Sequence, residues 1–181
     1  MKKHRLTLIL GGLLVIAAIA ALFIPLRTAL VFYEENTENI EAFLPLEAGD
    51  TFQIIFTHSI HLTDVVEKYE VMDTYEIRQN EIIYEEFGIG MPSNAEKGAT
   101  FSHENGRYHV KDLDNYFASM NIRNGKAVSE HRLVWNSSTD NTSENEKMVW
   151  FNEYFEPGAW FTLKVEKLSL WDYWKGVKIS D

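Results

Sequence analysis

The first pattern along the chain is a long apolar run near its start. Residues 6–24 contain no charged side chain, and Thr7 is their only polar residue. As a helix, these 19 residues would cover roughly 28 Å at about 1.5 Å per residue, close to the thickness of the hydrocarbon core of a bilayer. The pattern therefore predicts a transmembrane anchor over residues 6–26, with the lipid bilayer as its partner.

The charges around this run predict its orientation. Lys2, Lys3 and Arg5 precede the run, whereas all 27 Asp and Glu residues follow it, beginning with Glu34. Basic flanks stay on the cytoplasmic side of a membrane. We therefore expect residues 1–5 to form a cytoplasmic basic stub. The protein is then a single-pass protein of the cytoplasmic membrane, with its N-terminus inside and its C-terminal domain outside. A signal peptide cleaved after Ala20 is the alternative, and it also exports the domain.

Beyond the run, the pattern of apolar positions changes from helical to extended. Residues 27–49 carry clustered Glu, Asn and Thr and then Pro45, which predicts a tether. From residue 50 onward, short segments such as 51–57 and 160–170 alternate apolar and polar side chains between turn residues, which predicts β-strands. The fold class expected for residues 50–181 is all-β, an antiparallel sandwich or barrel-like domain preceded by one N-terminal transmembrane helix.

Two local signals refine this prediction. Asn105-Gly106 suits a two-residue type I′ turn, which would pair His103 with Tyr108 and Ser102 with His109 in a hairpin. The tail of residues 170–175 is rich in aromatic side chains, and its two Trp residues would share a face if it is helical. That tail either closes the end of the core or contacts the bilayer interface or a membrane partner. Residues 136–146 are polar and predict an exposed loop.

Composition excludes some partners. The part of the chain beyond Tyr33 carries 13 Lys and Arg against 27 Asp and Glu, a net charge of −14. Such a surface repels nucleic acid, so we expect no nucleic-acid partner. The chain contains no Cys, so it has no disulfide and no lipid-modified cysteine.

The segment Thr57-His58-Ser59-Ile60-His61 invites a catalytic or metal-binding interpretation. Adjacent residues of a strand point to opposite faces, so His58 and Ser59 are badly placed to form a nucleophile and base pair. His58, His61, Asp64 and Glu67 would share one stripe only on a helix, which the β-branched residues of the segment oppose. We therefore expect no enzyme activity, no metal site and no cofactor.

A second motif, Phe87-Gly-Ile-Gly-Met-Pro92, follows a predicted strand. It lacks the third glycine of a dinucleotide-binding fingerprint and the Lys of a P-loop. Two glycines free the backbone for a tight bend. The bend serves either close packing of the main chain or contact with a ligand, and both interpretations stay open.

Six elements in a fixed order resemble the bacterial family called domain of unknown function 1850. They are His58-Ser59, Glu67-Lys-Tyr69, Phe87-Gly-Ile-Gly-Met-Pro92, Gly106-Arg-Tyr108, His131-Arg-Leu133 and Gly158 before a final strand, and the resemblance covers roughly residues 52–170. Members are small exported or membrane-anchored proteins encoded beside the permease of a TAXI-type tripartite ATP-independent periplasmic (TRAP) transporter. The resemblance implies an accessory role, with the TRAP transporter permease or its solute-binding protein as partner.

Carried onto this chain, the resemblance implies a set of candidate binding positions. They are His58, Ser59, Glu67, Gly88, Gly90, Pro92 and Arg132. The polar trio of His58, Glu67 and Arg132 would bind a carboxylate or a partner loop, or would form an internal network that fixes the fold. The predicted function is a membrane-anchored extracytoplasmic binding domain, an accessory of a TAXI-type TRAP transporter. The alternative is a stand-alone binding module for a small solute or a cell-wall polymer.

Overall fold

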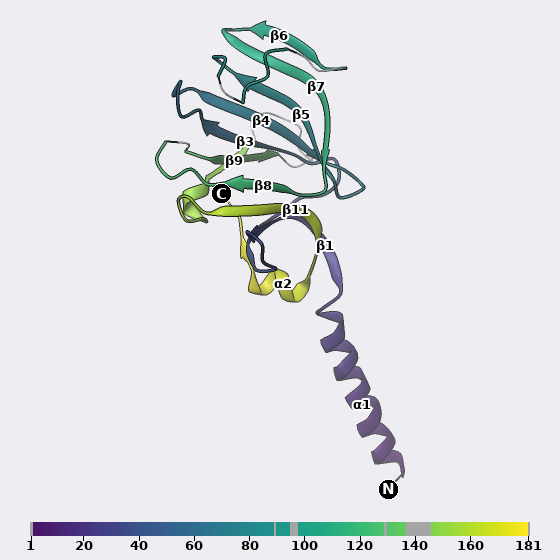
Figure 1. The fold of residues 1–181 in the computed structure, drawn as a ribbon. Coiled ribbons are helices and arrows are strands. Elements are labelled where there is room, and N and C mark those ends of the chain that lie inside the picture. Colours follow the sequence, from purple (N-terminus) through teal and green to yellow (C-terminus); the bar gives the residue numbers. More distant parts are fainter. Residues whose placement is uncertain (1, 89, 95–97, 129, 137–145, 181) are drawn as a thin grey trace.

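The computed structural model describes residues 2–88, 90–94, 98–128, 130–136 and 146–180. Two β-sheets lie face to face, and one helix extends away from them (Figure 1). The five-stranded sheet has the order β12-β2-β1-β11-β8, and the seven-stranded sheet has the order β10-β9-β3-β4-β5-β7-β6. Every pairing is antiparallel except that of β12 with β2. The fold is thus mostly β and sandwich-like, as the alternating pattern predicted.

The elements have the following bounds. The strands of the five-stranded sheet are β1 (Pro25–Glu34), β2 (Ile40–Pro45), β8 (Met120–Arg123), β11 (Trp160–Ser169) and β12 (Val177–Lys178). Those of the seven-stranded sheet are β3 (Thr51–Thr57), β4 (Asp64–Val71), β5 (Ile77–Tyr84), β6 (Thr100–Glu104), β7 (Arg107–Phe117), β9 (Arg132–Asn136) and β10 (Lys147–Trp150). The helices are α1 (Lys2–Ala21), the 3-10 helix η2 (Phe151–Glu153) and α2 (Leu170–Lys175).

The main core lies between the two sheets. Inward side chains of β1 and β11 meet those of β3, β4 and β9; among them are Leu30, Phe32, Phe161, Leu163, Phe52, Ile54, Tyr69 and Leu133. A second, smaller cluster lies on the other face of the five-stranded sheet, where Tyr173 of α2 packs on Phe43 with ring centroids 4.5 Å apart. A third cluster covers the inner face of β4, β5, β6 and β7 and includes Val65, Tyr84 and Val110.

The predicted anchor of residues 6–26 needs correction in its extent. Helix α1 ends at Ala21, and Pro25 already belongs to β1, which pairs with β11 from Pro25 opposite Ser169 onward. Pairing across so long a sequence distance cannot be read from a local apolar run. Within the part of the chain that the structure describes, no helix combines the length and the apolar character needed to cross a membrane.

The tether predicted for residues 27–49 was wrong. Its apolar flanks form β1 and β2, and β1 lies in the middle of the five-stranded sheet with Leu30 to Phe32 fully buried. The polar residues that predicted a linker form the tight turn between these strands, in which Asn36 has a positive φ of 59°. A short polar cluster is compatible with a hairpin turn as well as with a linker, and only the pairing partner decides between them.

The hairpin at Asn105-Gly106 is confirmed. Both residues have positive φ values, 53° and 80°, as a type I′ turn requires. In the register of β6 and β7, Ser102 lies opposite His109 and His103 opposite Tyr108. The polar loop predicted for residues 136–146 lies, except for its two end residues, outside the described residues.

Candidate functional site

His58 closes the turn between β3 and β4. Its backbone N–H donates to the carbonyl oxygen of Thr63 at 2.8 Å, and its own carbonyl oxygen accepts from the N–H of Leu62 at 2.9 Å. The ring Nδ1 of His58 accepts the backbone N–H groups of Ile60 and His61 at 3.3 and 3.4 Å. Two donors on Nδ1 place the proton of a neutral ring on Nε2. The ring is therefore fixed in one orientation, and the backbone of the turn holds it.

Gly88 packs directly against this turn. A Cβ atom at Gly88 would lie 2.9 Å from Nε2 of His61, closer than real Cβ atoms approach a neighbour, and 3.1 Å from Nε2 of His58, which is a tight contact. The two rings stack with centroids 5.0 Å apart, and His61 also pairs with Glu86 through Nδ1 and Oε2 at 2.9 Å. The structure thus brings together two predicted positions, His58 and Gly88, that are far apart in sequence. The reason for glycine here is space.

The predicted position Ser59 lies at the same turn and is exposed. Its neighbours Ile60 and Leu62 are exposed as well, with 62% and 65% of their surfaces accessible. Nδ1 of His58 accepts backbone N–H groups, so this ring nitrogen is not available as a base for the Ser59 hydroxyl. The turn therefore presents a polar ring inward and aliphatic side chains outward.

The loop that contains Gly88, Gly90 and Pro92 is held at both ends. The N–H of Met91 donates to the carbonyl oxygen of Gly88 at 3.0 Å, and Gly90 adopts a φ of +89° that favours glycine. The buried Tyr84 donates its hydroxyl to the carbonyl oxygen of Pro92. Burial raises the pKa of Tyr84, so this donor keeps its proton at neutral pH. The loop is thus attached to β5 over the inner face of the sheet.

A cavity of about 400 Å³ lies between this loop and strands β5 and β7. Its walls come from Ile82, Gly90, Met91, Pro92, Asn94, Val110, Leu113 and Asn115. Two of the predicted positions, Gly90 and Pro92, therefore line a cavity of the size that small ligands occupy. Its aliphatic walls carry two side-chain amides, a mixture typical of sites for small amphipathic groups.

Glu67 lies on the inner face of β4, two residues from the core residue Tyr69 and in line with it. The Tyr69 hydroxyl donates to Oε2 of Glu67 at 2.8 Å, Gln79 hydrogen-bonds Tyr69, and Nδ2 of Asn115 donates to Oε1 of Gln79 at 3.1 Å. Burial raises the pKa of Glu67, and the hydrogen bond from Tyr69 opposes that rise. This chain of donors runs from the cavity wall at Asn115 to the Glu67 carboxylate.

The predicted trio of His58, Glu67 and Arg132 does not converge. Arg132 lies on the outer face of the seven-stranded sheet, where its Nη2 pairs with Oδ1 of Asp64 at 2.6 Å and its guanidinium lies over the ring of Trp150 at 5.2 Å. Glu67 points to the inner face and is bonded to Tyr69. Because successive side chains of a strand alternate between faces, the sheet itself separates Glu67 from Arg132.

The residue before Arg132 is partly buried in an aromatic environment. The His131 ring stacks on Phe56 with centroids 5.5 Å apart and is tilted against Phe151 with centroids 5.4 Å apart, and its Nδ1 accepts the N–H of Gly125 at 3.2 Å. Burial, with a further contribution from the Arg132 charge, lowers the pKa of His131 to about 4. His131 is therefore neutral at physiological pH.

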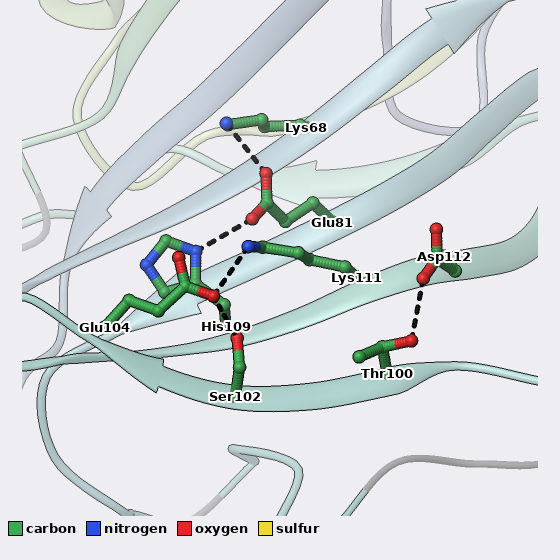
Figure 2. A network of polar contacts seen from close by, with 8 residues as sticks. All are labelled: Lys68, Glu81, Thr100, Ser102, Glu104, His109, Lys111 and Asp112. Carbon is green, nitrogen blue, oxygen red and sulfur yellow. Dashed lines mark hydrogen bonds and ion pairs between the residues drawn. The ribbon is translucent and has the colours of Figure 1, made fainter.

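The outer face of β4, β5 and β7 carries a network of charged side chains (Figure 2). Glu81 is its centre: Oε2 pairs with Nζ of Lys68 at 2.7 Å, and Oε1 contacts Nδ1 of His109 at 2.8 Å. Burial acts to raise the pKa of Glu81, but the hydrogen bonds from Lys68 and His109 outweigh it, so the net pKa is lowered. Glu81 is therefore a carboxylate at neutral pH.

The network continues across the β6–β7 hairpin. Glu104 accepts hydrogen bonds from Lys111 at 2.8 Å and from Ser102 at 2.7 Å, and Thr100 donates to Asp112 at 2.8 Å (Figure 2). The hydrogen bond from Lys111 lowers the pKa of Glu104 to about 2. A cleft of about 550 Å³ beside this network is lined largely by charged side chains of both signs. The opposite charges pair with one another, which favours a solvated surface over a ligand site.

The cavity residues on β5 and β7 were not predicted as site residues. Ile82, Val110, Leu113 and Asn115 belong to an alternating strand pattern, but the register of β5 and β7 shifts between Gln79 and Glu81. In β7, Asp112 has a positive φ of 59°, which brings Leu113 and Asn115 to the cavity wall. No local signal in the sequence marks an irregularity of this kind.

A metal centre is not evident in the geometry. Within residues 2–88, 90–94, 98–128, 130–136 and 146–180, no three His, Asp or Glu side chains are grouped as metal ligands. Of the four residues weighed as a metal site, His58 and His61 stack beside Gly88, Asp64 pairs with Arg132 and Glu67 bonds Tyr69. Within β4, Asp64 pairs with Arg132 on the outer face, whereas Glu67 bonds Tyr69 on the inner face.

Comparison with known protein families gave one result. The family model described as Domain of unknown function (DUF1850) matches residues 52–141, which include the His58 turn, the Gly88–Pro92 loop and the cavity. The match ends before the last strand of each sheet, so it is shorter than the expected range of residues 52–170. No curated protein and no solved structure matches the chain.

Proposed function

Because residues 52–141 belong to the DUF1850 family, we propose that the protein is a membrane-anchored extracytoplasmic binding domain. In this proposal it is an accessory of a TAXI-type TRAP transporter, and its partner is the permease or the solute-binding protein. The anchor is the apolar N-terminal segment, whose large side chains from Leu8 to Ile19 are exposed beside the domain. A domain held in this way has a high effective concentration at a neighbouring membrane protein.

The observation that carries the partner role is the exposed apolar surface around Gly88. Ile60 and Leu62 project from the His58 turn, and Phe87 precedes Gly88 with 45% of its surface accessible. The Phe87 ring rests on Tyr108 with centroids 4.3 Å apart, so its position is fixed by the third core cluster. Aliphatic and aromatic side chains held rigidly at a surface are typical of protein-binding sites.

Site-specific photocrosslinking in native membranes tests this role. A photoreactive amino acid replaces Leu62 in the full-length protein, and a control variant carries it at Thr37, an exposed residue of the β1–β2 turn. We expect the Leu62 variant to form an adduct with a transporter subunit, identified by mass spectrometry, and the Thr37 variant to form none. Equal labelling at both positions, or no transporter adduct at Leu62, would remove the support for this role.

The cavity favours a second candidate, a stand-alone binding module for a small solute. Its aliphatic walls suit an apolar body, and the donor chain from Asn115 toward Glu67 leaves the amide oxygen of Asn115 to accept a hydrogen bond. The net charge of −14 beyond Tyr33 disfavours anions. The expected ligand is therefore a neutral or cationic compound with a short branched alkyl group and an N–H or O–H donor.

A matched pair of probes tests the solute role on the full-length protein. Isocaproamide and isocaproate share one alkyl body and differ in the head group. We expect thermal stabilisation by the amide and none by the carboxylate, with loss of the effect in Leu113→Phe, which fills the cavity. Asp114→Asn, on the same strand but outside the cavity lining, is the control and should respond like the wild type. No response to the amide, or a response that survives Leu113→Phe, would exclude this ligand class from the cavity.

A further inference from the structure

The aromatic tail lies beside the point where the chain leaves α1. Helix α2 follows β11 and lies close to the start of β1 (Figure 1). The N–H of Trp171 donates to the carbonyl oxygen of Leu22 at 3.0 Å. The rings of Phe23 and Trp171 have centroids 5.7 Å apart, and those of Trp171 and Trp174 lie 5.5 Å apart. Two segments from opposite ends of the sequence therefore form one surface at the base of the domain.

This surface is apolar and exposed. We call it the collar, and its large exposed apolar side chains are Leu22, Phe23, Ile24, Leu26, Leu170, Trp171, Trp174 and Val177. Trp174 has 79% of its surface accessible, which is unusually high for a tryptophan side chain. An apolar patch of this extent marks an interaction surface.

The chemistry of the collar identifies its partner as a bilayer. The patch continues directly into the exposed apolar side chains of α1, so one partner covers both. The exposed residues Arg27, Lys175 and Lys178 each directly follow a collar residue in the sequence, and the Arg27 guanidinium lies 5.1 Å from the Tyr173 ring centroid, although the domain as a whole is acidic. Trp side chains beside basic residues are typical of the layer between lipid headgroups and acyl chains.

The single acidic residue of α2 does not oppose this arrangement. Oδ2 of Asp172 accepts hydrogen bonds from the hydroxyl of Ser169 at 2.6 Å and from its N–H at 3.2 Å, closing a capping box at the start of the helix. The carboxylate is therefore turned toward the helix start and occupied there. The charge that the collar presents outward is basic.

The collar is also rigidly attached to the sheet. Tyr173 packs on Phe43, the N–H of Ile179 donates to the carbonyl oxygen of Phe43 at 2.8 Å, and Ile179 is buried. Gly176 allows this approach, because a Cβ atom there would lie 2.9 Å from the Phe43 ring. The Trp side chains therefore have a fixed direction relative to both sheets.

We propose that the collar inserts Trp171 and Trp174 into the headgroup layer of the bilayer and so fixes the orientation of the domain on the membrane. This inference rests on the membrane anchoring in the proposed function. It assigns the aromatic tail a role in addition to closing the core. The cavity and the Gly88 surface would then keep a constant height and direction relative to membrane partners.

Fluorescence quenching by brominated lipids tests the collar. The full-length protein is incorporated into phosphatidylcholine vesicles with bromine near the headgroup end of the acyl chains. We expect Trp171→Phe/Trp174→Phe to lose most of the lipid-dependent quenching. The matched control, Trp150→Phe/Trp160→Phe, should retain the lipid-dependent quenching. Trp160 begins β11, and the collar follows Ser169 at the other end of that strand, roughly 30 Å away at about 3.4 Å per residue.

Three outcomes would overturn the inference. If the vesicles float without the protein, the anchoring and the collar both fail. If the protein floats but Trp171 and Trp174 are quenched by aqueous iodide instead of brominated lipid, the collar lies in water while the anchoring stands. If neither reagent quenches them, protein covers the collar, and a second copy or a partner chain replaces the bilayer as its occupant.

Discussion

Adjacent residues on three strands of the seven-stranded sheet have opposite environments. Glu67 on β4, Val110 on β7 and His131 before β9 face inward, while their neighbours Lys68, Lys111 and Arg132 face outward. Inside, an acid is kept beside a tyrosine hydroxyl and a histidine is kept neutral. Outside, each cation has a carboxylate partner. The comparison teaches that candidate polar residues must be sorted by face before they are grouped into a site.

The largest expected effect tests the partly buried, neutral state of His131. Its pKa of about 4 lies below the ordinary value of about 6.5, so the unfolded chain takes up a proton at a higher pH than the native protein does. This contribution to the free energy of unfolding is complete above about pH 6.5 and is lost as the pH falls toward 4, on the order of 2 to 3 kcal/mol. In His131→Gln that loss should disappear from denaturant titrations across this range.

The exposed His103 provides the control for this measurement. His103→Gln should keep the acid-dependent loss of the wild type. An equal pH slope in His131→Gln and the wild type would show that another group causes the acid sensitivity.

The second test compares Val110→Ala with Lys111→Ala. Val110 is buried in the third core cluster, so its truncation should cost about 2 kcal/mol in the free energy of unfolding. Lys111 pairs with Glu104 on the exposed face, and its truncation should leave chemical unfolding unchanged within error. Similar losses in both variants would contradict the separation of the two faces.

The third test concerns the contact between the Gly88 loop and the His58 turn. A methyl group in Gly88→Ala would meet two stacked imidazoles at 2.9 to 3.1 Å, and overpacking of this kind should cost roughly 1 to 2 kcal/mol. Thermal unfolding measures this loss, and because Gly88 does not have a positive φ, the loss reports the close contact and not backbone strain. In the double variant Gly88→Ala/His61→Ala, removal of the His61 ring should recover part of the lost stability.

The smallest expected effect comes from Glu67. Burial raises its pKa, so the native protein binds this proton more tightly than the unfolded chain does, and stability declines as the pH rises above the ordinary value of about 4.3. Glu67→Gln keeps an acceptor for Tyr69 and should stabilise the protein at neutral pH, on the order of 1 kcal/mol, with no gain near pH 4. The outward Glu70, paired with Arg78 at 2.6 Å, supplies the control, since Glu70→Gln should give no gain.

Part of the fold could be predicted from sequence because it depends on local rules. Asn105-Gly106 determines its hairpin, including the register of Ser102 with His109, because few residue pairs accept two positive φ values. The shared face of Trp171 and Trp174 follows from helical spacing. The segment 27–49 failed as a prediction, because its polar turn looks like a linker and its strands find partners more than 100 residues away.

The candidate site divides along the same line. Its glycines and His58 can be recognised in the sequence, because glycine permits unusual backbone conformations and histidine is a common functional side chain. Three features depend on strand pairing and on the shifted register of β5 and β7. They are the contact of Gly88 with His58, the cavity beside Gly90 and Pro92, and the placement of Glu67 and Arg132 on opposite faces of the sheet. Their predicted roles in binding stay predictions.

The sequence by itself determined the strand alternation, the type I′ hairpin, the acidic surface and the apolar N-terminal segment, because each depends on neighbouring residues or on composition. Only the tertiary structure decided which polar side chains face the interior and which segments meet at the collar. The physical reason is that burial and contact are properties of residues distant in sequence. A glycine, a carboxylate or a tryptophan acquires its role from the neighbour that the fold places against it.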